Sequence, residues 1–241
     1  MTTPVAPPTT AEGKASVWED FLDIFYAPAQ VFARRMDGKF GLALLVLVIL
    51  SAVLTYAMMQ SLEPAFSGEM DRQMSQAAAE NPNITPEQME GMRGFGSIMM
   101  MAYAVVGVPI MVMLTGLILW LVGKMFDSVQ TLGQALMVAT YANFPRLLGS
   151  LLMTLQGFVI DPANMNRVYD VSFSAARFAP EGTSELVLAL LSRIDVFTIW
   201  ATILLGLGLH VTGKVPKTNA MIAAFIVFII GSLPVVLGAM R

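Results

Sequence analysis

The chain has 241 residues, of which 56% are hydrophobic and 13% are charged. Soluble domains are about 45–50% apolar and about 25% charged, so this chain has few charges for the surface of a soluble globule. The absence of cysteine excludes a disulfide scaffold, and the apolar composition excludes a disordered chain. The composition therefore predicts a protein that resides in a membrane.

The segment before the first long apolar window divides into a tail and a helix. Residues 1–15 are rich in Pro, Thr and Ala, which predicts a flexible tail. Ser16 followed by Glu19 has the spacing of a capping box, and apolar side chains then recur at helical intervals. We expect an amphipathic cytoplasmic helix over residues 16–40, kinked or split at Pro28. Its candidate partner or membrane-surface residues are Trp18, Phe21, Phe25, Tyr26 and Pro28.

This predicted helix has two interpretations. In the first, one face lies on the membrane or receives a protein partner. In the second, the helix is a plain elbow that leads the chain into its first span. The residues predicted to share that face are Trp18, Phe21, Leu22, Phe25 and Phe32.

Five windows meet the requirement of about 20 apolar residues for a helix that crosses a bilayer. They lie at about 41–62, 98–123, 132–160, 187–212 and 218–240. The predicted fold is therefore all-α: a polytopic transmembrane helical bundle with five spans and an N-terminal interfacial amphipathic helix. The second window belongs to a longer charge-free run, so its helix must tilt or kink, and Gly107 with Pro109 is a plausible place. Pro145 and Pro234 are further kink candidates.

The predicted orientation follows from basic residues next to the spans. Arg34, Arg35 and Lys39 directly precede the first window, which predicts a cytoplasmic N-terminus. Five spans then place the C-terminus outside. The loop Glu63–Arg93 becomes an outer segment that is acidic, compatible with helix and rich in methionine. Thioethers can bind Cu(I), but the chain has no cysteine and one histidine, and methionine is also an ordinary apolar filler.

The charged residues inside the windows are Arg146, Arg193 and Asp195. Ionisable groups within spans are functional candidates. One hypothesis is a buried Arg146–Asp195 pair that lines a polar pathway. The other places Arg193 and Asp195 at the outer interface and satisfies Arg146 with carbonyl groups that Pro145 leaves free.

Enzyme motifs are absent from the sequence. It contains no phosphate-binding glycine loop or dinucleotide fingerprint, and its single histidine lacks an evident set of partners for a catalytic triad or a metal site. It also has no basic patch for nucleic acid. We therefore expect no enzymatic activity and no cofactor. The expected partners are the lipid bilayer and a protein at the N-terminal helix, and small residues such as Gly149 and Gly208 would permit a homo-oligomer.

Three short segments resemble the Yip family, the integral membrane proteins that interact with Ypt/Rab GTPases, in its prokaryotic branch. Residues 23–28 (Asp-Ile-Phe-Tyr-Ala-Pro) resemble the family's Asp-Leu-Tyr-Gly-Pro element, with Ala27 in place of Gly. Residues 141–145, from Tyr141 to Pro145, are similar to a second element, which has Gly where this chain has Thr140. Residues 195–209 are similar to bacterial members.

The resemblance implies five spans and a cytosolic N-terminus, here in a bacterial cytoplasmic (inner) membrane. Eukaryotic members act with prenylated small GTPases in vesicle traffic, a role that is not transferred to a bacterial chain. The resulting hypothesis is a non-enzymatic membrane scaffold, adaptor or membrane-organising protein that works through its N-terminal helix. The alternative is a small transporter or channel that uses Arg146 and Asp195.

Overall fold

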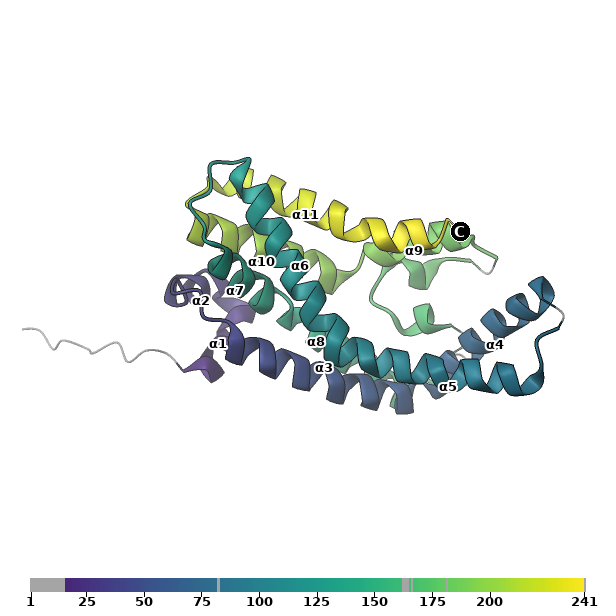
Figure 1. Ribbon diagram of the computed structural model, residues 1–241. Coiled ribbons are helices and arrows are strands. Elements are labelled where there is room, and N and C mark those ends of the chain that lie inside the picture. Colours follow the sequence, from purple (N-terminus) through teal and green to yellow (C-terminus); the bar gives the residue numbers. More distant parts are fainter. Residues whose placement is uncertain (1–15, 82, 162–164, 166, 181, 241) are drawn as a thin grey trace, which may run out of the picture.

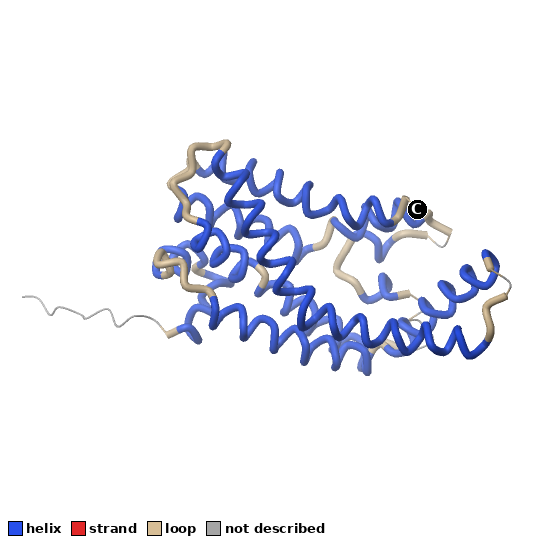
Figure 2. The backbone as a smooth tube through the Cα atoms, viewed as in Figure 1, coloured by secondary structure: helices blue, strands red, loops and turns tan. Residues whose placement is uncertain are grey.

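The computed structural model describes residues 16–240 except 82, 162–164, 166 and 181, so the predicted tail over residues 1–15 lies outside it. Helices dominate the described residues, and none of these residues belongs to a strand (Figure 2). An isolated β-bridge joins Ser174 to Asp195. The fold class is all-α, as expected from the composition.

The N-terminal region forms two helices, α1 (Val17–Tyr26) and α2 (Pro28–Arg34), rather than one. The predicted capping box is present: the Ser16 hydroxyl accepts from the Glu19 amide at 3.3 Å, and the Glu19 carboxylate accepts from the Ser16 amide at 3.1 Å. The chain reverses at Ala27, and Pro28 begins α2, where its missing amide proton costs no helical hydrogen bond.

The first two windows form long helices. Helix α3 (Gly41–Ser61) leads into α4 (Glu63–Glu80), and α5 (Pro86–Ala102) continues through the π-helical segment η1 (Tyr103–Gly107) into α6 (Val108–Lys124). The apolar stretch Glu90–Lys124 has 35 residues, a length of about 50 Å that exceeds a hydrocarbon core of about 30 Å. The π-helical segment ends at the predicted kink. A Cβ on Gly107 would lie 2.3 Å from the Tyr103 ring, so only glycine accommodates this ring position.

The third window is two helices, not one: α7 (Leu132–Ala142) and α8 (Phe144–Val159). Pro145 occupies the first turn of α8 and cannot donate a helical hydrogen bond to the preceding turn. The Asn143 side-chain amide donates a hydrogen bond to one backbone carbonyl of that turn, that of Ala139, at 2.7 Å.

The fourth window is also divided, into α9 (Glu185–Arg193) and α10 (Val196–Gly213). The window over 187–212 therefore holds parts of two helices, because Asp195 caps a new helix N-terminus. Helix α11 (Lys217–Gly238) matches the last window and contains Pro234. Two short 3-10 helices, η3 (Val168–Val171) and η4 (Ala175–Phe178), lie between α8 and α9.

Among the residues that the structure describes, four helical segments are long and apolar enough to cross a membrane: Gly41–Ser61, Glu90–Lys124, Val196–Gly213 and Lys217–Gly238. Helix α10 is central, with contacts to α11, α7, α8 and α2. Close packing depends on glycine, because a Cβ on Gly208 would lie 2.2 Å from Val138 of α7. Helices α1 and α2 lie at one end of the bundle, and α4 with the start of α5 projects from the opposite end (Figure 1).

Candidate functional site

A buried charged cluster joins the N-terminal helices to the bundle. The Asp20 carboxylate on α1 has no exposed surface. It accepts hydrogen bonds from Arg34 at 2.8 Å and Arg35 at 2.5 Å, at the end of α2, and from the Tyr141 hydroxyl on α7 at 3.3 Å. Because a buried carboxylate needs such partners, this cluster fixes α1 against both α2 and α7.

Asp23, one turn further along α1, extends the charged cluster toward solvent. The Tyr26 hydroxyl and the Arg34 guanidinium hydrogen-bond to the Asp23 carboxylate and hold its pKa below its usual range. Arg34 therefore bridges Asp20 and Asp23. The two arginines balance the two carboxylates, so the cluster has no net charge.

The predicted apolar face of the N-terminal helix is divided between two directions. Phe21 stacks on Phe144 with ring centroids 4.7 Å apart, and Phe25 meets the Trp200 ring edge-on at 5.5 Å. These side chains, with the buried Ile24, Val31 and Phe32, attach α1 and α2 to the core. The outward face instead exposes Trp18, Leu22 and Tyr26, at 69%, 67% and 74% of their surface.

The charged residues of the third and fourth windows do not form an ion pair with each other. The Asp195 carboxylate caps α10 by accepting the Thr198 amide at 2.9 Å. Arg146 is exposed, and its guanidinium donates to the Asn143 side chain at 3.1 Å.

Arg193 ends α9 and contacts α11. Its Nε donates to the Ser232 hydroxyl at 3.0 Å, and its guanidinium lies 5.7 Å from the centroid of the Phe228 ring. These contacts hold α9 on α11. Arg146, Arg193 and Asp195 thus have local structural partners, and the buried charged cluster around Asp20 is the more extensive network.

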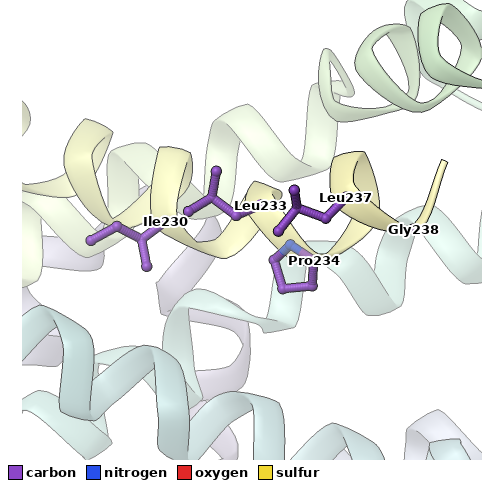
Figure 3. Close-up of a pocket in the computed structure, with 5 residues that line it drawn as sticks. All are labelled: Ile230, Leu233, Pro234, Leu237 and Gly238. Atoms are coloured by element: carbon purple, nitrogen blue, oxygen red, sulfur yellow. The ribbon is translucent and has the colours of Figure 1, made fainter. Parts of the chain in front are cut away.

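The described residues contain no group of three or more His, Cys, Asp or Glu side chains that could hold a metal ion. A surface hollow of about 500 Å³ lies along the C-terminal end of α11 (Figure 3). All of its lining residues belong to this one apolar helix, so it fits lipid acyl chains better than a polar ligand. They are Ile230, Leu233, Pro234, Leu237 and Gly238.

Sequence reasoning selected Tyr141 but missed its hydrogen-bond partner Asp20 and the pairing of Asp20 with Arg34 and Arg35. The first two helical turns carry acids and the end of the segment carries arginines, a distribution that also suits the dipole of one continuous helix. Pro28 was the available sequence signal for this cluster, because a chain reversal there brings the acidic start and the basic end of residues 16–36 together.

Comparison with known proteins identifies the family. The model of the Yip1 domain matches residues 22–238, a range that contains Arg34, Arg35 and Tyr141. The chain belongs to the Yip1 family. A relative in this comparison is the membrane protein YknW of Bacillus subtilis (strain 168), which is 27% identical over 183 residues, covering 76% of this chain and 74% of the relative. No solved structure matches. As a Yip1-family chain with several apolar helices, the protein is a multi-pass integral membrane protein.

Proposed function

We propose that this Yip1-family protein is a non-enzymatic membrane scaffold or adaptor whose partner-binding surface is the outward face of α1. The observation that carries the proposal is that α1 is fixed to the bundle by buried contacts on one face and exposes apolar side chains on the other. Asp20 fixes α1 to α2 and α7, while Trp18, Leu22 and Tyr26 point away from the core. A helix held in this way presents its side chains without the entropy cost of ordering a loop.

The proposed topology has five spans, with α7 and α8 together forming the third crossing. Two contacts support this crossing. At the start of α7, Gln134 donates to the Met36 carbonyl at 2.8 Å, next to the beginning of α3. Near the end of α8, a Cβ on Gly157 would lie 2.5 Å from the Ser61 carbonyl oxygen, at the end of α3. The α7–α8 pair therefore runs parallel to a candidate span along its whole length.

The proposed orientation places α1, α2 and the N-terminus in the cytoplasm of a bacterial cell. The loop between α6 and α7 lies beside the loop between α10 and α11, since the Val129 amide donates to the Gly213 carbonyl at 3.1 Å. These adjoining segments carry Lys124, Lys214 and Lys217, and Arg34 and Arg35 precede α3 on the same side. Basic residues favour the cytoplasmic side.

The test replaces the outward face without disturbing the core. Deletion of residues 16–36 would remove the buried Ile24 and Phe32, so loss of function in that variant would be uninformative. The triple variant Trp18→Ser/Leu22→Ser/Tyr26→Ser changes three exposed side chains. It also removes the hydrogen bond from Tyr26 to Asp23, but it leaves Asp20 with both arginines, so α1 stays attached to α2. The matched control is Met125→Ser/Val129→Ser, because both of these residues are exposed on the same side of the bundle.

Proteins that co-purify from native membranes are compared between the two variants at equal expression and thermal stability. We expect the triple variant to lose a partner that the control retains. Retention of every partner by the triple variant would contradict the proposal. Photocrosslinks from position 22 to lipid alone would instead identify α1 as a membrane-surface helix.

Transport is a second candidate function, favoured by the charged residue Arg146 on α8, which packs against the candidate spans α3 and α10. Flux through liposomes is compared for the wild type, Arg146→Gln and Asp195→Asn. Absent flux, or flux that is equal in all three proteins, would eliminate this candidate.

A further inference from the structure

A cavity of about 330 Å³ lies where the end of α3 meets α4, α5 and η3. Helices α4 and α5 diverge from this point (Figure 1). Two contacts join them beside the cavity: Arg93 pairs with Asp71, and the Met70 methyl group packs on Gly96, where a Cβ would lie 2.8 Å away. The volume of the cavity is within the range of about 300–1,000 Å³ typical of small-molecule sites.

Most of the cavity wall is apolar and deformable. Each of the three long helices contributes a methionine: Met59 from α3, Met70 from α4 and Met100 from α5. Phe66 and Val168 complete the apolar lining. Methionine side chains adapt their shape and are polarisable, and the face of an aromatic ring attracts cations.

The charge that the protein leaves unneutralised in this cavity is negative. The lining contains the carboxylates of Glu63 and Glu69 and the guanidinium of Arg93. Arg93 is paired with Asp71, and Glu69 with Arg72 at 2.7 Å. Glu63 accepts a hydrogen bond from the Ser67 hydroxyl, and no cationic side chain of the described residues lies within ion-pair distance of it.

We propose that this cavity binds a lipophilic organic cation. The apolar body of the ligand contacts Met59, Met100 and Phe66, and its positive centre lies against the Glu63 carboxylate. Met59 and Met100 belong to candidate spans, so a cation that partitions into the bilayer reaches the site from the lipid. An anion of the same shape would be repelled by Glu63. The proposal is independent of the scaffold role assigned to α1.

The experiment uses the full chain in nanodiscs with radiolabelled tetraphenylphosphonium, and counts binding above protein-free nanodiscs. Tetraphenylborate, which has the same shape and opposite charge, is the ligand control. We expect saturable binding of the cation and, relative to it, at least fivefold weaker binding of the anion. Equal binding of the two ions, or no saturable binding of the cation, overturns the proposal.

Glu63→Gln removes the charge and keeps the shape of the side chain. Since the carboxylate is exposed, we expect roughly fivefold weaker binding of tetraphenylphosphonium. The matched control is Glu87→Gln, which makes the same change in the first turn of α5, outside the cavity lining. A second variant, Ser97→Phe, fills the cavity from an exposed position and is expected to abolish binding. Wild-type affinity in both Glu63→Gln and Ser97→Phe would also overturn the proposal.

Discussion

Replacement of Asp20 by Asn tests whether the buried charged cluster holds α1 in place. The substitution keeps the size of the side chain and removes its charge. Loss of one member of a buried ion pair costs about 3–5 kcal/mol. Two features reduce this cost: Arg34 retains Asp23 as a partner, and the side chains of Arg34 and Arg35 are 31% and 19% exposed, so water can solvate them. We therefore expect the free energy of local unfolding of α1 and α2 to fall by about 2–3 kcal/mol.

Hydrogen exchange of the α1 and α2 amides measures this loss locally. A cost of that size corresponds to roughly 30- to 150-fold faster exchange. The matched control is Asp37→Asn, because Asp37 is 47% exposed and pairs with a Lys39 side chain that is 84% exposed. The control should exchange within about threefold of the wild type. If Asp20→Asn exchanges no faster than Asp37→Asn, Asp20 does not hold α1 and the basis of the proposed partner surface is lost.

Two further pairs of variants test the packing and the capping of α10. Gly208→Ala should lower the stability by about 1–3 kcal/mol, because its Cβ would meet the fully buried Val138. Gly231→Ala, which meets no neighbouring atom, should leave the melting temperature unchanged or raise it. Asp195→Ala should cost about 1 kcal/mol and Asp195→Ser much less, since serine also caps helices. Equal melting temperatures for the Ala and Ser variants would show that the cap is not the role of Asp195.

Hydropathy predicted the positions of the apolar windows because a helix in lipid must satisfy its backbone internally and cover itself with apolar side chains. It did not predict the helix ends within the third and fourth windows. Composition in a window is insensitive to hydrogen bonding, and these breaks depend on Pro145 and Asp195. The spacing of Asp195 and Thr198 is an N-cap signal that the apolar surroundings obscured.

The buried charged cluster was harder to predict, because the residues that contact Asp20 are distant from it in the sequence. Asp20 lies 14 residues from Arg34 and 121 from Tyr141. The first distance closes only when the chain reverses at Ala27, and the second only when α1 packs on α7. Neither event follows from the local pattern.

The departures from the two Yip elements are compatible with the fold that those elements form. Ala27 has a φ of −134°, which any L-residue adopts, so glycine is not required at the reversal. Thr140 is fully buried within α7, and its hydroxyl donates to the Leu136 carbonyl at 2.8 Å. The first element reverses the chain between Asp20 and the arginines of α2, and the second supplies Tyr141 to the same carboxylate. Two short motifs from distant parts of the sequence thus act at one buried group, which makes that group the structural link between the N-terminal helices and the membrane bundle.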